Sequence, residues 1–389
     1  MKIRRSYRFR IYPSAEQIRR LDQWSGALRF LWNLANEQRL AALARPRGER
    51  PRVGWVQQGR ELTQLRAAAP WLADTPRRSG DAVLKRLHVA WAGAFARAKR
   101  RPRFQKKGDP SPAIELDRRE VLWAGPRRVS LAKLGSVAIV VHRAMPGRTI
   151  GVALTREAGD WFVVFTQEIE ATPAERLPGA VGIDRGIVSL IADSDGRTVE
   201  GPRFAERSAR KLKRVQRALS RTSKGSSNRA KARLRLARAH RKVRRQRDWL
   251  QHQISHDYAK SHGVVVIEKL ETARMTRSAR GTVDSPGRNV RAKAGLNRSI
   301  LDAGWSGLAE KLRYKLEERG GELVEVPAAY SSQTCSACGV VDAASRRTQS
   351  EFCCVGCGHE ANADINAARV ILSRWNPPVQ PVEACDGAA

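Results

Sequence analysis

Two closely spaced pairs of cysteines near the C-terminus constrain the fold of this chain more than any other feature. Cys335 and Cys338 form one Cys-x2-Cys motif, and Cys354 and Cys357 form a second after fifteen intervening residues. Each motif places two thiolates on a tight turn, and two such turns complete the tetrahedral site that zinc prefers. Because four thiolates leave no open coordination position, we expect a structural zinc ribbon and not a catalytic zinc site.

The residues around the cysteines support this expectation. Gly339 and Gly358 directly follow the two motifs and supply the open backbone that such turns need. Cys353 leaves the register of the second pair ambiguous, although only Cys354 has the two-residue spacing to Cys357. All six cysteines lie in the last 55 residues, and in a reducing compartment this crowding indicates metal binding and not disulfides.

The charge of the chain points to a polyanionic partner. The 389 residues include 73 Lys and Arg against 38 Asp and Glu, a net charge of +35, which excludes an ordinary metabolic enzyme. Such a surplus repels itself unless a polyanion such as nucleic acid lies nearby. Hydrophobic residues make up 41% of the chain, enough for packed cores. The sequence shows no membrane-spanning run and no signal peptide, so we expect a cytoplasmic protein with no membrane partner.

The first half of the chain predicts a β-module that is interrupted by helices. Residues 1–12 alternate in polarity as a strand does, and Ser14 and Gln17 form a capping box that opens a helix. Helical patterns continue to about residue 98 and end at a basic, proline-interrupted stretch, 101–108. Short apolar alternations at 113–170 then predict antiparallel strands.

The second half predicts a mixed module. A strand is expected at 180–184, with a hairpin through 188–192, a buried strand at 263–268, a helix from about 296 to 319 and a strand at 322–326. Residues 272–295 are predicted to be a loop, residues 362–369 a helix, and the tail beyond Trp375 disordered.

The most basic segment lies between the hairpin at 188–192 and the buried strand that ends at Glu268. Residues 203–250 hold 19 Lys and Arg against Glu206 and Asp248, and apolar positions at helical spacing predict a basic helical hairpin with a break at 222–228. A solvated pair of charged helices is the simpler interpretation. However, such helices usually mix Glu with Lys, and this segment does not.

Three acids occupy positions typical of a metal-dependent site. Asp184 lies on the first strand of the second half, Glu268 ends an apolar strand, and Asp364 lies on the last helix. A buried carboxylate needs a partner, and carboxylates are ligands that suit Mg²⁺. A pair of such ions can support phosphodiester hydrolysis. Each acid alone is more often a helix cap or a salt-bridge partner, but their order in a chain of this charge is more specific.

These segments resemble a known family. The stretches 182–186, 265–270, 331–339 and 362–368 are similar to those of TnpB, the RNA-guided nuclease encoded by insertion sequences, and of its relatives, the compact type V CRISPR effectors. The resemblance covers nearly the whole chain. It implies that Asp184, Glu268 and Asp364 are a RuvC-like catalytic triad that binds two Mg²⁺ ions. Arg185 departs from the family pattern, because many members have an apolar residue there.

The resemblance also implies an α+β multidomain architecture. An N-terminal wedge-like β-barrel would comprise 1–13 and 101–178, with a helical recognition insertion at 14–100. An RNase H-like (RuvC) nuclease domain would comprise 179–330 and 360–375, with the basic helices at 203–262. The zinc ribbon would be inserted at 331–359, and 376–389 would be a disordered tail.

The implied activity is RNA-guided cleavage of DNA next to a short target-adjacent motif, in a protein associated with a transposable element. The expected partners are a guide RNA, with one protein per RNA, and double-stranded target DNA, and the expected location is a prokaryotic cytoplasm or its nucleoid. Residues expected to contact nucleic acid are Arg101, Arg103, Lys106, Lys107, Arg238, Arg241, Arg244 and Arg245.

Three alternatives remain open from the sequence. The first is a CRISPR effector nuclease, which the short chain disfavours. The second is an RNA-guided repressor without cleavage, which the complete triad disfavours. The third is a RuvC-like enzyme that needs no RNA, such as a resolvase, which would not need so large a charge surplus.

Overall fold

The chain folds into two compact units, Met1–Ala171 and Thr172–Ala389, which are described separately. The computed structural model describes residues 2–107, 109, 112–170 and 177–375. The tail predicted to be disordered, 376–389, lies outside the described residues, which end at Trp375. Across the described part of the chain, no helix combines the length and the apolar character that crossing a membrane requires.

The first unit is built on a seven-stranded antiparallel sheet with the order β2-β6-β7-β1-β5-β4-β3. Its edge strands β2 and β3 are separated in sequence only by the short 3-10 helix η2, so the sheet curls into a nearly closed, barrel-like form. The strands are β1 (Lys2–Tyr12), β2 (Ile114–Leu116), β3 (Val121–Trp123), β4 (Arg128–Leu131), β5 (Gly135–Val140), β6 (Arg148–Glu157) and β7 (Asp160–Glu170).

The helices of this unit are inserted between β1 and β2. They are α1 (Ala15–Ala44), α2 (Trp55–Ala68), α3 (Pro70–Ala73) and α4 (Arg77–Phe95), with 3-10 turns η1 (Arg47–Glu49) and η2 (Arg118–Glu120). The predicted capping box is present, because the Ser14 hydroxyl accepts from the amide of Gln17 and the Gln17 side chain accepts from the amide of Ser14. Trp24 and Trp91 are fully buried in the core that these helices share with the sheet. Those two tryptophans are therefore core residues and not stacking platforms.

The second unit contains a mixed five-stranded sheet with the order β10-β9-β8-β11-β12. Strand β11 is parallel to β8 and β12, while β9 is antiparallel to β8 and β10. The strands are β8 (Ala180–Asp184), β9 (Ser189–Asp193), β10 (Thr198–Glu200), β11 (Val264–Glu268) and β12 (Glu322–Val326).

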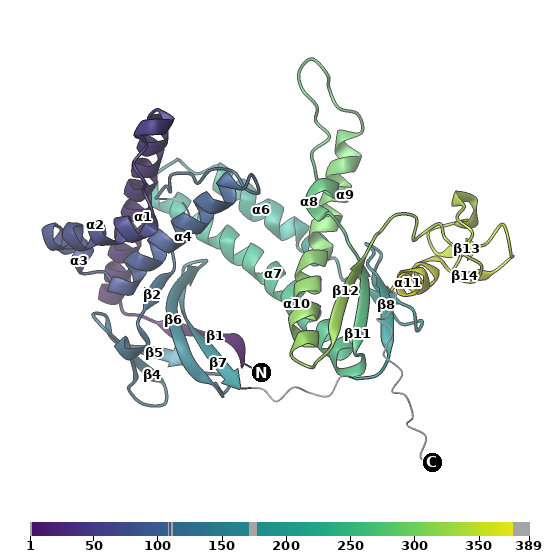
Figure 1. The fold of residues 1–389 in the computed structure, drawn as a ribbon, viewed down its shortest axis with the longest axis horizontal. Coiled ribbons are helices and arrows are strands. Elements are labelled where there is room, and N and C mark those ends of the chain that lie inside the picture. The colour runs from purple at the N-terminus through teal and green to yellow at the C-terminus, as the bar shows by residue number, and fades with distance from the viewer. Residues whose placement is uncertain (1, 108, 110–111, 171–176, 376–389) are drawn as a thin grey trace, which may run out of the picture. The chain divides into compact units, whose positions relative to one another are not determined.

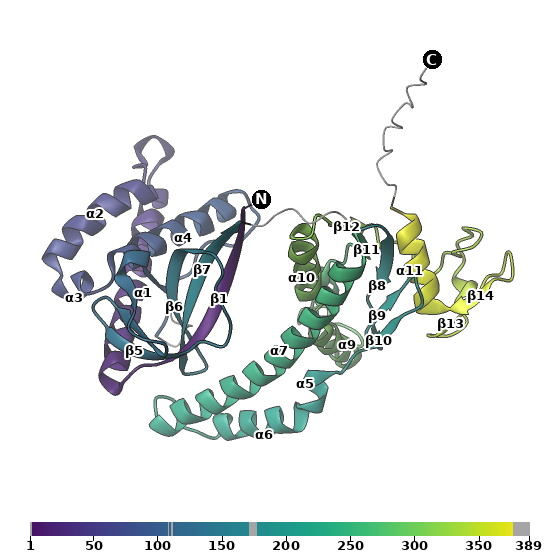
Figure 2. The same ribbon diagram turned by 90° about the horizontal axis from the view of Figure 1, so that it is seen from below.

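Helices cover both faces of this sheet, as Figures 1 and 2 show. Val265 and Ile267 of β11 pack in a core with α7 and α10, whereas Val264 and Val266 pack against Ile371 of α11. Burial on both faces explains the continuous apolar sequence of β11. The helices are α5 (Phe204–Arg207), α6 (Ala209–Ser220), α7 (Ser227–Ser261), α8 (Thr272–Met275), α9 (Val290–Ala303), α10 (Trp305–Glu317) and α11 (Ala363–Ser373).

The predicted basic hairpin is confirmed as α6 and α7, which lie side by side (Figure 2). Ser226 caps α7 by accepting from the amide of Arg229. The Arg229 guanidinium in turn donates to the carbonyl oxygens of Leu219 and Thr222 at the end of α6. The turn between the two helices is thus stabilised by specific hydrogen bonds.

One helix prediction was wrong. The single helix expected from about 296 to 319 is two helices, α9 and α10, because Gly304 adopts a left-handed backbone conformation with φ of +66°. Glycine adopts this conformation without a Cβ penalty and ends α9 there. The loop expected over 272–295 is correspondingly shorter, since α8 occupies its start and α9 begins at Val290.

A close contact between Gly182 of β8 and α11 determines how near the last helix comes to the sheet. A Cβ atom at Gly182 would overlap the carbonyl oxygen of Ala368 and lie 2.8 Å from the Cβ atom of Leu372. Only glycine therefore permits this approach. Because Asp184 and Asp364 lie on these two elements, the contact also limits the separation of two of the predicted site residues.

We predict that Gly182→Ala lowers the melting temperature of the protein, because a backbone carbonyl cannot yield as a flexible side chain can. The expected cost is about 1–3 kcal/mol, as in other overpacked sites. Gly295→Ala is the matched control: its Cβ would meet only the end of the Arg298 side chain, at 3.9 Å, and alanine favours the helix α9. Melting temperatures are measured by calorimetry. A melting temperature of Gly182→Ala equal to or above that of the wild type would contradict the prediction that glycine is required at this contact.

Candidate metal-dependent nuclease site

Strand geometry brings the first two predicted acids to one edge and one face of the sheet. In the β8–β11 register, Gly182 lies beside Val266 and Ile183 beside Ile267, so Asp184 and Glu268 follow at neighbouring strand ends. Side chains alternate along a strand, and Gly182 and Val266 face α11. Asp184 and Glu268, two residues further along, therefore face the side on which α11 lies.

Asp364 approaches the same place from the first turn of α11. The side chain of Asn362 caps this helix by accepting from the amides of Asp364 and Ile365. The cap begins the helix directly after strand β14 (Glu360–Asn362) of the ribbon and sets Asp364 at its N-terminus, where a helix dipole favours a carboxylate.

The protonation of Asp184 shows that the three acids form one electrostatic cluster. Burial raises the pKa of its carboxyl group to about 7, and the negative charges of Glu268 and Asp364 add to this rise. Arg346 and the backbone amide of Arg185 act in the opposite direction. Near neutral pH this carboxyl group therefore gains or loses a proton readily, and cation binding at the cluster would favour proton release.

Glu268 is 7% exposed, and its surroundings hold it firmly. The Ser331 hydroxyl donates a hydrogen bond to one carboxylate oxygen of Glu268. The guanidinium of Arg185, only 6% exposed, donates to the backbone oxygen of Glu268 and, at 3.5 Å, to that of Trp305. Arg185 is therefore a buried cation behind the acids, tied to the strand end that presents Glu268.

Arg346 is a site residue that the sequence analysis did not identify. It lies in the ribbon between the two cysteine motifs, and its guanidinium donates to the Asp364 carboxylate at 3.1 Å and to the carbonyl oxygen of Gln349 at 2.9 Å. Ser331 was likewise missed as a partner of Glu268, although it stands in the segment on which the resemblance rested. An arginine within a ribbon gives no sequence signal that it pairs with an acid eighteen residues later.

The carboxylate cluster is looser than the cysteine cluster. Among the described residues, one group of His, Cys, Asp or Glu side chains is compact enough to hold a metal ion. It consists of Cys335, Cys338, Cys354 and Cys357, whose ligand atoms all lie within 4.8 Å of one another. The three acids are brought to one neighbourhood, but Ser331 and Arg346 each engage a carboxylate oxygen. Carboxylate oxygens are nevertheless the donors that suit a hard divalent cation.

The four cysteines have the geometry of a tetrahedral thiolate site. The Sγ atoms of Cys335 and Cys357 are 3.8 Å apart, and those of Cys338 and Cys354 are 3.5 Å apart. Zinc–sulfur bonds of about 2.3 Å in a tetrahedron require sulfur atoms roughly 3.8 Å apart. The backbone amides of Cys357 and Gly356 lower the pKa of the Cys354 thiol, whereas hydrogen bonds with the neighbouring thiols raise the pKa of Cys338. The four sulfur atoms therefore titrate as one group, as closely spaced metal ligands do.

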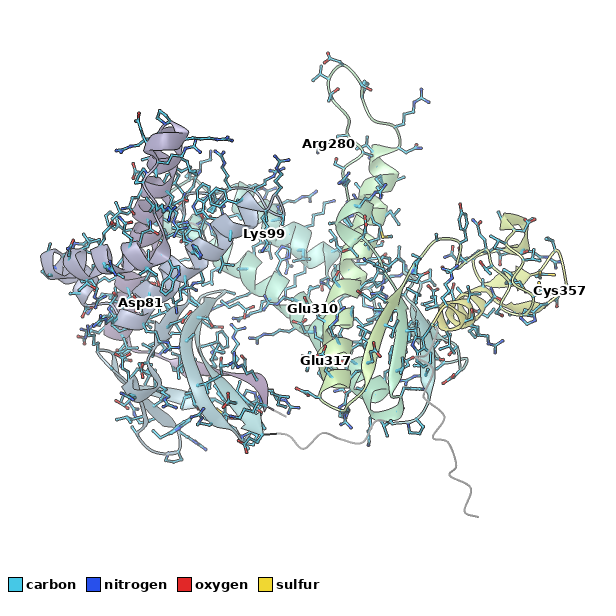
Figure 3. All side chains as sticks on the ribbon, in the orientation of Figure 1. Asp81, Lys99, Arg280, Glu310, Glu317 and Cys357 are labelled. Carbon is cyan, nitrogen blue, oxygen red and sulfur yellow. The ribbon has the colours of Figure 1, made fainter. Side chains whose placement is uncertain are left out.

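The structure resolves the ambiguity of the second motif. Cys354 belongs to the cluster, whereas Cys353 lies on β13 (Glu351–Cys353), paired with Glu360 of β14 (Glu360–Asn362). The two turns are alike: the amide of Gly339 donates to Cys335 and that of Gly358 to Cys354, both with positive φ. Cys357, labelled in Figure 3, marks the ribbon in the second unit.

A buried asparagine fastens the ribbon to the helix that carries Asp364. Asn366 is fully buried, accepts from the amide of Ser336 at 2.9 Å and donates to the carbonyl oxygen of Thr334 at 2.8 Å. The first cysteine turn is therefore attached one helical turn or less from the acid. The folding of the ribbon and the position of Asp364 are physically linked.

The residues expected to contact nucleic acid fall into two groups, one in each unit. The backbone of the 101–107 stretch is held along α1, where Trp32 and Asn33 bond to Arg103 and Gln105, and the side chains of Arg101, Arg103, Lys106 and Lys107 are exposed. Arg238, Arg241, Arg244 and Arg245 lie on α7. Their contacts with nucleic acid stay a prediction.

Comparison with known structures first defines the class of fold. The chain is similar to Cas12f1 in a complex with a single guide RNA and target DNA, with a TM-score of 0.61, 12% identity, and coverage of 97% of this chain and 99% of the other. At this identity the likeness shows the fold, which is that of a compact Cas12f-type effector.

Sequence comparison then gives the family. The chain is 36% identical over 380 residues to the "Putative RNA-guided DNA endonuclease InsQ" of Escherichia coli, covering 96% of this chain and 92% of that protein. It is 32% identical over 379 residues to a "Putative RNA-guided DNA endonuclease" of Streptomyces pristinaespiralis, covering 96% and 89%. This chain belongs to the TnpB family of IS605-type proteins, as the sequence resemblance indicated.

Three family models match parts of the chain. They are described as a helix-turn-helix domain at 1–47, a probable transposase at 162–279 and a Cas12f1-like TNB domain at 305–371. The first description does not fit the geometry, since residues 1–47 are mainly strand β1 and one long helix, α1.

We predict that Cys354→Ser abolishes stoichiometric metal binding by the ribbon, whereas Cys353→Ser retains it. The two variants make the same chemical change at adjacent positions, and only Cys354 lies in the cluster. Elemental analysis of both purified proteins measures the outcome. Equal loss of metal from both, or from neither, would contradict the assigned register.

The pKa of Asp184 predicts a pH-dependent stability in metal-free protein. A carboxyl group with a folded pKa near 7, raised from 3.8, stabilises the fold at low pH, and this contribution is lost as pH rises from about 4 to 7. Asp184→Asn should remove that part of the slope. Melting temperatures measured in chelator across this range test the effect, and an unchanged slope in the variant would contradict it.

Proposed function

We propose that this protein is an RNA-guided DNA endonuclease, with Asp184, Glu268 and Asp364 as its catalytic acids. The observation that carries the proposal is the shared electrostatic cluster of three carboxylates in a chain with a net charge of +35. The relatives' descriptions support the same activity. The strand order β10-β9-β8-β11-β12 supports an RNase H-like, RuvC-type assignment for the unit that carries the acids.

The acids would hold two Mg²⁺ ions, which supply activation of the attacking water and stabilisation of the leaving oxygen. In this scheme Asp184 is a ligand once its proton is released. Ser331 orients Glu268, and Arg185 fixes the strand end from behind. Arg346, paired with Asp364 when no ion is bound, would exchange this partner for a phosphate oxygen of the substrate.

The ribbon cysteines would hold a structural zinc ion. The closed set of four thiolates supports this assignment, because no position is left for substrate or water. Through Asn366 the ion would stabilise the start of α11 and hence the position of Asp364.

The first unit would serve as a wedge-like barrel, 1–13 and 101–178, with a recognition insertion at 14–100, and would help to read a short motif beside the target. Base pairing would carry the remaining specificity, and the exposed cations would bind the phosphates of guide RNA and target DNA. We further propose one protein per RNA and a location in the prokaryotic cytoplasm, at the nucleoid when bound to DNA.

Similarity over nearly the whole chain supports association with a transposable element. The match to a Cas12f1 protein of Sulfoacidibacillus thermotolerans reaches 48% identity but covers 16% of this chain and 15% of that protein. A compact CRISPR effector therefore remains the second candidate. A repressor without cleavage is disfavoured by the intact acids, and a resolvase-like enzyme by the family relationship.

We predict that Glu268→Gln abolishes guided DNA cleavage while binding of RNA and DNA persists, because the change removes a ligand charge without adding bulk. Glu271→Gln is the matched control, since Glu271 is three residues away, exposed and paired with Arg274. Asp184→Asn and Asp364→Asn should act as Glu268→Gln does. Cleavage is assayed with Mg²⁺ and the RNA that copurifies with the protein.

Two outcomes would contradict the proposal. Wild-type cleavage rates in Glu268→Gln would show that this residue is not a ligand. Efficient site-specific cleavage by protein freed of RNA, with no redirection when the guide sequence is changed, would favour the resolvase-like alternative.

A further inference from the structure

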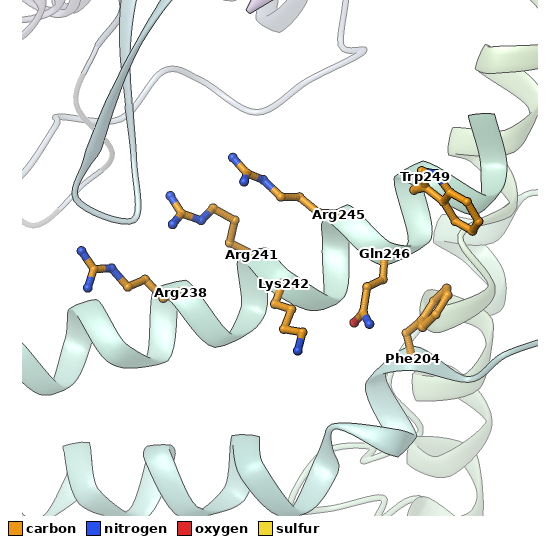
Figure 4. A pocket seen from close by; sticks show the side chains of 7 residues that line it. All are labelled: Phe204, Arg238, Arg241, Lys242, Arg245, Gln246 and Trp249. Carbon is orange, nitrogen blue, oxygen red and sulfur yellow. The ribbon is translucent and has the colours of Figure 1, made fainter. Parts of the chain in front are cut away.

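A basic groove with aromatic residues at one end lies along α7, and none of the three acids lines it. Its cavity has a volume of about 520 Å³, within the range of small-ligand sites. Figure 4 shows three arginines extending from one side of α7 and a lysine and a glutamine from another, with the two aromatic rings together at one end. The lining residues are Phe204, Arg238, Arg241, Lys242, Arg245, Gln246 and Trp249.

The two aromatic side chains lie outside the hydrophobic cores of the described residues. Trp249 is 63% exposed, and neither Trp249 nor Phe204 belongs to a hydrophobic core cluster of the described residues. Phe204 is half-buried on the short helix α5. Neither ring stacks on another aromatic ring in the described part of the chain.

Four of the seven residues that line the groove are cations. Arg238, Lys242, Arg245 and Trp249 follow one another at helical spacing along α7, over about 16 Å, and Lys242 extends to another side of the helix than the arginines (Figure 4). No acid lines the groove.

Cations beside exposed aromatic rings match the chemistry of an unpaired nucleotide. In a duplex the base faces are covered by stacking, so a side chain reaches phosphates but not base faces. A base that has left the helix can stack on an aromatic ring while cations bind its phosphates.

We propose that Phe204 and Trp249 form a stacking site for an unpaired nucleobase, with Arg238, Lys242 and Arg245 binding the adjacent phosphates. The inference rests on the proposed function and deepens it, because it assigns the groove to an unpaired segment of the guide RNA or of the displaced DNA strand. Both strands share the required chemistry.

The test compares affinities of the full-length protein, stripped of nucleic acid, for defined probes. Trp249→Ala should weaken binding of a short oligouridylate or oligothymidylate roughly tenfold. The slope of log affinity against log salt should not change, because no charge is lost. Trp249→Phe should retain most of the affinity, whereas Trp249→Leu, which keeps apolar bulk but no ring face, should not. Lys242→Ala should instead reduce the salt slope by about 0.7.

Two further probes separate stacking from a general effect. An abasic oligonucleotide and a blunt RNA duplex should bind Trp249→Ala and wild type equally. Trp71→Ala, at an exposed tryptophan of α3, should change none of these affinities. A larger effect with oligouridylate identifies RNA as the occupant, and a larger effect with oligothymidylate identifies the DNA strand; both support the site.

The inference is overturned if Trp249→Ala binds the single-stranded probes as the wild type does, or if it loses abasic and duplex binding equally. These titrations need neither a guide nor cleavage. Failure of guided cleavage with stacking intact would therefore refute only the proposed function. Guided cleavage with an unaffected Trp249→Ala would refute only the stacking site.

Discussion

Burial of neighbouring carboxyl groups at the ends of β8 and β11 is the constraint on which the proposed site of the second unit depends. Burial, with the charges of Glu268 and Asp364, raises the pKa of Asp184 to about 7. The sheet places two of the acids by strand register, and Gly182 lets α11 bring the third close. The arrangement is electrostatically costly without a counterion, which supports the proposed role of these acids in binding cations.

The surrounding residues reduce this cost without removing it. Arg185 lies behind the strand end, and Arg346 reaches across from the ribbon to Asp364. The ribbon is therefore attached to α11 at two places. Asn366 bonds to the first cysteine turn, and Arg346 of the ribbon pairs with Asp364 on that helix. Metal binding at the cysteines and the geometry of the acid cluster are consequently coupled through a few short contacts.

The basic hairpin adds a different kind of surface to the same unit. Its apolar positions close α6 against α7, while the cations of α7 and two aromatic rings line a groove. A groove of this chemistry distinguishes an unpaired base from a duplex, which charge alone does not. The long-range attraction and the local stacking would therefore act on different features of the same nucleic acid.

The sequence by itself determined the cysteine spacing, the strand and helix patterns, the basic hairpin and the three acids, because these depend on local periodicity and residue chemistry. Local patterns did not reveal the break at Gly304, which depends on one left-handed residue. The tertiary structure alone decided that Cys354 and not Cys353 joins the cluster, that Gly182 admits α11, and that Ser331 and Arg346 meet the acids. Such contacts join residues far apart in the chain, so their partners follow only from the packing of the sheet, the last helix and the ribbon.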